Sequence, residues 1–125
     1  MSHHPYSIEL HDSRLSTIRR ESAELILLLS PAYIHRDGKG WRQMADLAIA
    51  GGMGDFNASE LPAHISDGTL KTVKGPYQNL LMLPLRDGGP VVLEVELESG
   101  AIIRVQGHAV EVRLFGEPEF IEDVA

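Results

Sequence analysis

The side chains with the widest chemical reach in this sequence are three histidines, His11, His35 and His108. Histidine nitrogens bind transition metals and transfer protons near neutral pH. Two histidines and a carboxylate on a β-barrel would make the iron site of a non-haem enzyme. The spacing does not favour such a site, because the sequence has neither a His-x-His pair nor a His-x-x-x-His pair. We therefore prefer dispersed histidines, and keep a metal or small-ligand site built from these three as the alternative.

Ser13, His35 and Asp46 supply the residue types of a hydrolytic triad. No Gly-x-Ser-x-Gly nucleophile elbow occurs, however. Asp12-Ser13 is more typical of a turn in which the Asp side chain accepts a backbone N–H. We therefore predict no catalytic residue, no metal ligand and no cofactor, and expect a protein that is not an enzyme.

Two further groups of residues suggest binding. Glu94, Glu96 and Glu98 form an acidic stripe on one face of a predicted strand. A solvated face is the preferred interpretation, and a docking surface for a basic partner is the alternative. Trp41 and Tyr33 flank a turn at 37–40, where aromatic residues can form a recognition hot spot, although we prefer to place them at the edge of the core.

Three segments in the first third of the chain resemble a family of small β-rich bacterial domains with no assigned activity. They are His11-Asp12-Ser13, Ala32-Tyr33-Ile34-His35-Arg36 and Gly40-Trp41-Arg42-Gln43. The resemblance implies a bacterial origin and transfers no functional residue. The residues that we predict for a ligand or partner surface are His11, Asp12, His35, Trp41 and His108.

Composition narrows the function classes. The 125 residues predict a single domain, 1–125, and the 43% hydrophobic content is ordinary for a globular protein. The absence of cysteine excludes disulfides, thiolate metal sites and thiol nucleophiles. A net charge of −7 with 11 basic residues disfavours nucleic-acid binding. The partner is instead expected to be an unknown, basic protein, or a second copy of the chain.

Location follows from two features of the sequence. No apolar run approaches the roughly 20 residues of a membrane-spanning helix, so no membrane association is expected. Residues 1–5 lack the basic and apolar regions of a signal peptide. We therefore expect a cytoplasmic protein.

Glycine-rich turns between apolar runs indicate β-hairpins. The expected strands are 6–10, 14–19, 24–36, 41–49, 69–74, 79–85, 91–97 and 101–115. The segment 41–50 also fits a helical spacing, and we choose strand because a hairpin turn precedes it. The long connection 51–66 holds one expected helical turn, where Asn57-Ala58-Ser59-Glu60 resembles a capping box.

Strand register follows from alternation. Apolar positions are odd at 93–105 and even at 110–114, which predicts a bulge at Gly107-His108 and a backbone conformation there that disfavours a Cβ. A three-residue loop, Glu98-Ser99-Gly100, would pair Val95 with Ile103 and Glu94 with Arg104. A second loop, Arg86-Asp87-Gly88, would pair Leu83 with Val91 and place Pro84 opposite Pro90.

These patterns predict an all-β, antiparallel fold, either a sandwich or a partly closed barrel of about eight or nine strands with at most one short helical turn. The leading hypothesis is a non-enzymatic binding or protein-interaction module. The run Leu25–Leu29 is apolar on both faces and needs cover on both sides, which favours self-association.

Overall fold

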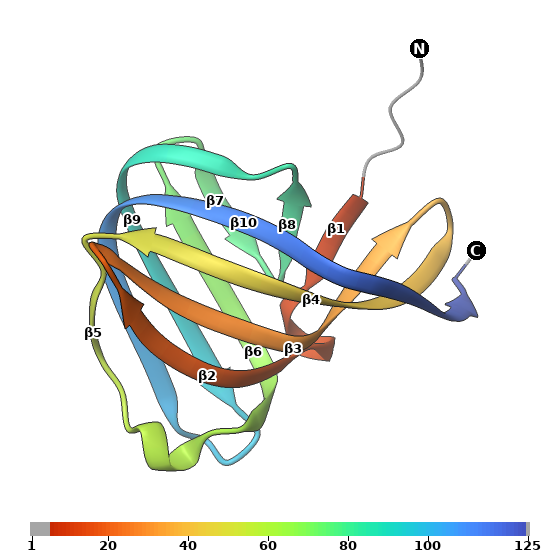
Figure 1. Ribbon diagram of the computed structural model, residues 1–125, viewed down its shortest axis with the longest axis horizontal. Coiled ribbons are helices and arrows are strands. Elements are labelled where there is room, and N and C mark those ends of the chain that lie inside the picture. Colours follow the sequence, from red (N-terminus) through yellow and green to blue (C-terminus); the bar gives the residue numbers. More distant parts are fainter. Residues whose placement is uncertain (1–5, 125) are drawn as a thin grey trace.

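The computed structural model describes residues 6–124 and is built almost entirely of antiparallel strands (Figure 1). The elements are β1 (Tyr6–Glu9), η1 (Leu10–Asp12), β2 (Arg14–Glu21), β3 (Glu24–Arg36), β4 (Lys39–Ala50), β5 (Met53–Asp55), η2 (Ala58–Glu60), β6 (Ala63–Thr72), β7 (Gly75–Gln78), β8 (Leu80–Leu83), β9 (Arg86–Leu97) and β10 (Ile102–Asp123). The all-β prediction is confirmed. Two single-turn 3-10 helices replace the one that was expected, and Asn57 does cap the second, through Ser59 N at 3.1 Å.

One ten-stranded sheet partly closes into a ring. The order β2-β6-β9-β10-β4-β3 returns to β2, because β2 pairs with both β6 and β3. The β2–β6 seam is short, with only Arg14↔His64 and Leu15↔Ala63 as partners. The interior is filled by Leu, Ile and Val side chains that alternate along the strands, among them Leu27, Leu47 and Leu93. A partly closed barrel therefore describes the fold better than a sandwich.

Beyond the ring, the hairpin of β3 and β4 and the end of β10 project to one side (Figure 1). There β1 pairs with the second half of β3, and β8 pairs with β1. This gives a five-strand extension in the order β8-β1-β3-β4-β10. Register shifts at 29–32 of β3 and at 115–119 of β10 mark where the ring becomes the extension.

The predicted register of the β9–β10 hairpin is confirmed. Val95 lies opposite Ile103, and Glu94 lies opposite Arg104 with Nη1–Oε2 at 3.4 Å. Gly100 has φ of +93°, a left-handed conformation that suits glycine in the third loop position. The hydrophobic face determines this register, since an exposed ion pair contributes little to the free energy of unfolding.

The second predicted hairpin is wrong. Residues Arg86 to Gly88 are not a loop but the first residues of β9, and Gly88 pairs with Ala109. Leu83 and Leu81 pair instead with β1. The physical reason is Asp87, whose buried carboxylate accepts hydrogen bonds from residues of β6 and β7 rather than turning toward water.

The bulge at Gly107 is confirmed by a register shift between Gly107 and Ala109. The reason for glycine differs from the one predicted, since its φ is not left-handed. A Cβ at this position would collide with the Ile49 side chain and lie 2.7 Å from Ala50 O. Close packing between β10 and β4 therefore requires the glycine.

Residues 41–50 form a strand, as predicted, within the longer β4. The segment 51–66, expected to be a connection with one turn, contains β5, η2 and the beginning of β6. The short strand β7 was also missed. No helix among residues 6–124 is long and apolar enough to span a membrane, and residues 1–5, on which the signal-peptide argument rests, lie outside the described residues.

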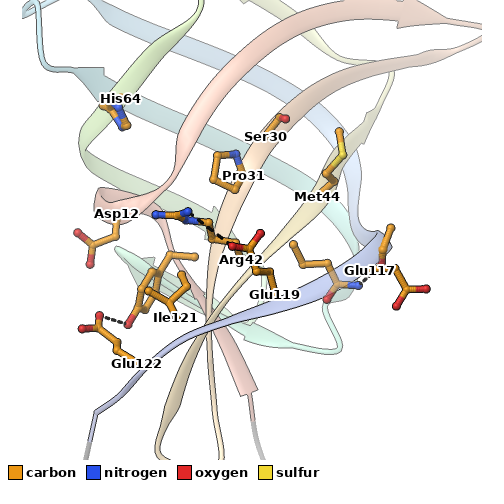
Figure 2. Close-up of a pocket in the computed structure, with 13 residues that line it drawn as sticks. Asp12, Ser30, Pro31, Arg42, Met44, His64, Glu117, Glu119, Ile121 and Glu122 are labelled. Atoms are coloured by element: carbon orange, nitrogen blue, oxygen red, sulfur yellow. Dashed lines mark hydrogen bonds and ion pairs between the residues drawn. The ribbon is translucent and has the colours of Figure 1, made fainter.

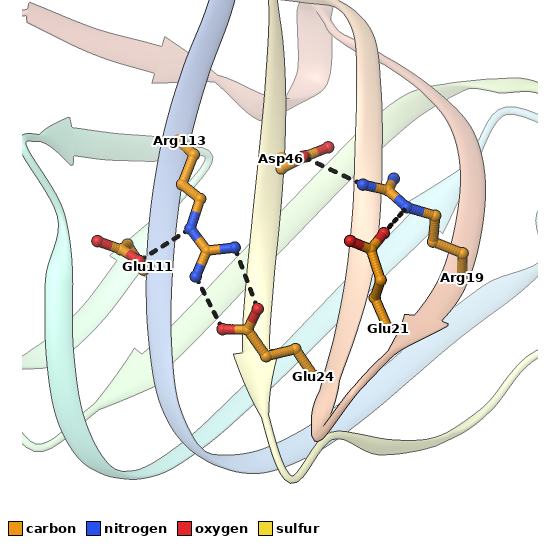
Figure 3. Close-up of polar contacts among 6 residues, drawn as sticks. All are labelled: Arg19, Glu21, Glu24, Asp46, Glu111 and Arg113. Carbon is orange, nitrogen blue, oxygen red and sulfur yellow. Dashed lines mark hydrogen bonds and ion pairs between the residues drawn. The ribbon is translucent and has the colours of Figure 1, made fainter.

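The doubly apolar run in β3 is covered within the chain itself. Leu25, Leu27 and Leu29 point into the core, and Ile26 on the outer face is only 3% exposed. Figure 3 shows ion pairs on this face: Arg113 with Glu24 at 2.8 Å and with Glu111 at 2.9 Å, and Arg19 with Glu21 and Asp46. Hydrogen bonds that Arg113 donates to the carboxylates of Glu24 and then Glu111 raise the pKa of Arg113, so it stays charged. Ile26 therefore needs no second molecule, and this run gives no reason to expect self-association.

Candidate functional site

A cleft of about 670 Å³ lies on the outer side of the sheet, where the ring becomes the extension (Figure 2). Its floor comes from β3 and β4. One wall is the end of β10, and the other is formed by Asp12 of η1 and His64 of β6. The lining residues are Asp12, Ser30, Pro31, Tyr33, Arg42, Gln43, Met44, His64, Gly116, Glu117, Glu119, Ile121 and Glu122.

Strand alternation decides which side chains reach the cleft. In β4, Arg42 and Met44 face the cleft and Ala45 belongs to the core, while Gln43 borders the cleft where its side chain reaches β10. In β10, Gly116 has φ of +77° within a register shift, which turns the strand at this wall. Gln43 Nε2 donates to Gly116 O at 3.0 Å and holds the turn against β4.

Tyr33 ties the floor to the β10 wall. Its hydroxyl donates to Glu122 Oε1 at 2.9 Å, across 89 residues of sequence. The ring lies over Gly40 on β4, and a Cβ at Gly40 would collide with the Tyr33 hydroxyl and lie 2.6 Å from Cζ. Burial first, and then the hydrogen bond to Glu122, together raise the pKa of Tyr33 to about 12. Tyr33 is therefore a neutral donor at physiological pH.

The cleft carries an excess of negative charge. Four carboxylates line it, against one arginine and one histidine. Arg42 Nη1 reaches Glu119 Oε1 only at 4.0 Å, and both side chains are exposed. Within residues 6–124, no ion pair involves Glu117 or Glu122. The electrostatics of the cleft favour a cationic ligand.

The three predicted histidines do not converge. His35 pairs across β3 and β4 with Gly40, whereas His108 lies beside Ala109, the partner of Ala50 at the other end of β4. Ten strand residues separate these ends, which corresponds to roughly 30 Å. The side chain of His108 would meet a Cβ at Gly51 and lines a different depression. The three-histidine site of the alternative hypothesis is therefore not assembled.

Near the cleft, His11 belongs to a different group of possible metal ligands, which contains Glu9 and Asp12 and not His35 or His108. Ligand atoms of Glu9, His11 and Asp12 all lie within 4.8 Å of one another. His11 Nε2 is 3.4 Å from Asp12 Oδ2, and both side chains are about half exposed. Burial raises the pKa of Glu9, and a side-chain hydrogen bond with Asp12 adds to the rise. His35 lies on the same face of the sheet, and its Nε2 is buried without a hydrogen-bond partner among the described residues.

Trp41 lies on the opposite face, toward the core, with its ring 5.4 Å from that of Phe120 in an edge-to-face contact. It lines a smaller pocket of about 290 Å³ with Tyr6, Ile34 and Gln43. Its Nε1 is buried and has no acceptor within residues 6–124. Of the five residues predicted for a binding surface, only Asp12 lines the large cleft.

The hydrolytic triad is not assembled either. Ser13 is buried, and its Oγ donates to Glu9 O at 2.8 Å and accepts from Tyr33 N at 2.9 Å. Ser13, rather than Asp12, therefore makes the local backbone bonds of this turn. Asp46 lies on the outer face of the ring and pairs with Arg19 at 3.3 Å.

Sequence reasoning missed most of the cleft, namely Tyr33 as a floor residue, Arg42, Met44, His64 and the β10 glutamates. A usable signal was present in Gly116-Glu117-Pro118-Glu119, a glycine followed by alternating carboxylates near the end of a long strand. Comparison of the chain with family models, curated proteins and solved structures finds no match. The resemblance to bacterial β-rich domains thus stays a prediction.

Proposed function

We propose that this protein is a non-enzymatic binding module, and that the cleft over β3, β4 and the end of β10 is its ligand site. The observation that carries the proposal is the convergence of polar groups from three separate strands in one concave surface, with Arg42, Tyr33 and Glu122 around an apolar floor at Met44 and Pro31. Ligand sites commonly combine an apolar lining with a few placed polar groups.

The proposal is tested by two-dimensional ¹H–¹⁵N NMR of the protein against a panel of cationic, anionic and neutral peptides and small molecules. A ligand of the module should shift the amide signals of Tyr33, Gln43 and Met44. The variant Met44→Trp, which fills the floor, should weaken binding, whereas Met53→Trp should not, since Met53 is 74% exposed on β5. Shifts confined to the pockets at Trp41 or His108, or no shifts with any member of the panel, would contradict the proposal.

A second candidate function is supported by the proximity of Glu9, His11 and Asp12. One imidazole and two carboxylates suit a divalent transition metal. Calorimetry with Zn²⁺ should then detect one site that His11→Ala abolishes and His108→Ala preserves. His3 and His4 should be replaced in every sample, because adjacent histidines bind metals on their own. Equal binding by the His11→Ala protein would remove this candidate.

A further inference from the structure

We infer that the occupant of the cleft is a basic segment of another protein, bound in an extended form with arginine or lysine side chains against the β10 glutamates. This inference rests on the proposed function of the cleft. It names the class of ligand, which the proposed function leaves open.

The wall of β10 offers a row of carboxylates. Glu117 and Glu119 are two residues apart and both line the cleft, and a register shift between Phe120 and Glu122 brings Glu122 to the same side. Alternate residues of an extended strand are roughly 7 Å apart on one face. An extended ligand with basic residues at alternate positions presents several cations on one face and therefore matches this row in charge.

The charges of the row are available to a ligand. Within the described chain, Glu117 has no ion pair, and Glu122 has one oxygen bound by the neutral Tyr33 hydroxyl. Glu119 has only the 4.0 Å contact to Arg42, between side chains that are 55% and 73% exposed. A ligand guanidinium would not have to displace a strong internal partner.

The floor suits the stems of basic side chains. Pro31, Met44 and Ile121 supply apolar surface beside the carboxylates. Arginine and lysine bury their methylene stems on apolar surface while their charged groups stay with water or an acid. A small metal ion or a bare amine would leave this surface uncovered.

A second copy of the chain is a poor occupant. Most of the basic side chains in the described part already pair with carboxylates within 4.0 Å, among them Arg19, Arg104 and Arg113. Pairing the end of β10 with itself would set glutamate against glutamate, which is unfavourable between neighbouring strands. Nucleic acids are repelled by the same carboxylates.

The test uses an acetylated and amidated eight-residue peptide with arginine at every second position, and the same peptide with citrulline in place of arginine. Citrulline keeps the shape of the side chain and removes its charge. Isothermal titration calorimetry at physiological salt should show binding of the arginine peptide, and roughly tenfold weaker binding of the citrulline peptide. Equal binding of the two peptides would overturn the inference.

Two triple variants separate a local site from overall charge. Glu117→Gln, Glu119→Gln and Glu122→Gln together should weaken binding of the arginine peptide roughly tenfold. Glu94→Gln, Glu96→Gln and Asp55→Asn together change the net charge equally at exposed positions of β9 and β5 that do not line the cleft, and should leave it within about twofold. Equal loss in both triple variants would mean that only net charge matters, and would contradict the inference.

The remaining outcomes distinguish failure of this inference from failure of the proposed function. If a neutral or anionic compound shifts the cleft amides and the arginine peptide does not, the inference fails and the binding module stands. If nothing shifts them, both fail. Sedimentation could also show a dimer that dissociates in the β10 triple variant. This result would identify a second copy of the chain as the occupant and would also overturn the inference.

Discussion

Replacing Gly107 with alanine adds one carbon at a close contact between β10 and β4. That carbon would overlap the Ile49 side chain and lie 2.7 Å from Ala50 O, a distance at which the backbone must move. Overpacking of this kind in a well-packed core costs about 1–3 kcal/mol. We expect Gly107→Ala to lower the free energy of unfolding by about that amount, and Gly107→Val by at least as much.

Chemical denaturation measures the effect, with Gly88→Ala as the matched control. Gly88 of β9 lies opposite Ala109 of β10, has no heavy atom within 4 Å of its would-be Cβ and does not require a left-handed φ. Its replacement should change the free energy of unfolding by no more than about 0.5 kcal/mol. Adding Ile49→Ala to Gly107→Ala should cost less than the sum of the two single changes. A neutral Gly107→Ala, or additive costs, would refute the packing argument.

The remaining predictions concern the buried carboxylate of Asp87 and the tightly held ring of Tyr33. Asp87→Ala should lower the free energy of unfolding by about 2–3 kcal/mol in urea denaturation. Asp87 is 4% exposed, and its loss leaves Thr72 and Lys74 without the carboxylate that they contact. A change below about 0.5 kcal/mol would contradict this prediction. Burial alone would raise the pKa of Asp87, but hydrogen bonds from Thr72 and Lys74 lower it overall. The contribution of the ionised Asp87 to the free energy of unfolding should be complete above pH about 4 and lost as the pH falls through its lowered folded pKa. In urea denaturation at the same pH values, Asp87→Asn should lack this acid-dependent contribution. Tyr33→Phe should remove the tyrosine that ionises near pH 12 in an ultraviolet titration. The wild-type protein should also lose stability between pH 10 and 12, because Tyr33 ionises at lower pH in the unfolded chain than in the folded one. An unchanged titration of Tyr33→Phe would mean that the raised pKa belongs to a different tyrosine. Gly40→Ala should displace the Tyr33 ring and return its pKa toward 10, whereas an unchanged titration would show that the ring does not lie over Gly40.

Alternation along a strand is a local property, and for that reason the β9–β10 register could be predicted. Two facing strands with one buried side have one register that matches apolar with apolar residues, and a shift of one residue inverts every side chain. The bulge at Gly107 could be predicted on the same ground, since the phase of the apolar positions changes there. The packing reason for glycine could not, because Ile49 and Ala50 are more than fifty residues away in sequence.

The segment Asp87-Gly88-Gly89 shows where local signals fail. It has the composition of a turn, yet the carboxylate of Asp87 is buried against Thr72 and Tyr77, which lie fifteen and ten residues upstream. A buried acid is stable only with such partners, and they become visible only when the sheet is assembled. The match of Leu81 with the apolar Ile8 of β1 was equally hidden.

The cleft is the least predictable part for the same physical reason. Tyr33 and Glu122 are 89 residues apart and meet only because β4 holds both strands. The three histidines were candidates because imidazole can bind metals. They do not form one site, because His35 and His108 lie at opposite ends of β4. Alternating glutamates after Gly116 were the one local signal, and they alternate as they would on any solvated strand.

The most direct test of the central claim is a titration of methyl-¹³C-methionine protein with the arginine peptide, followed by NMR. Met44 lies on the cleft floor, whereas Met53 and Met82 are exposed on β5 and β8 and serve as internal controls. We predict that the Met44 methyl signal shifts saturably and that the signals of Met53 and Met82 stay in place. A shift of Met53 or Met82 with Met44 unmoved would contradict the assignment of the cleft as the ligand site.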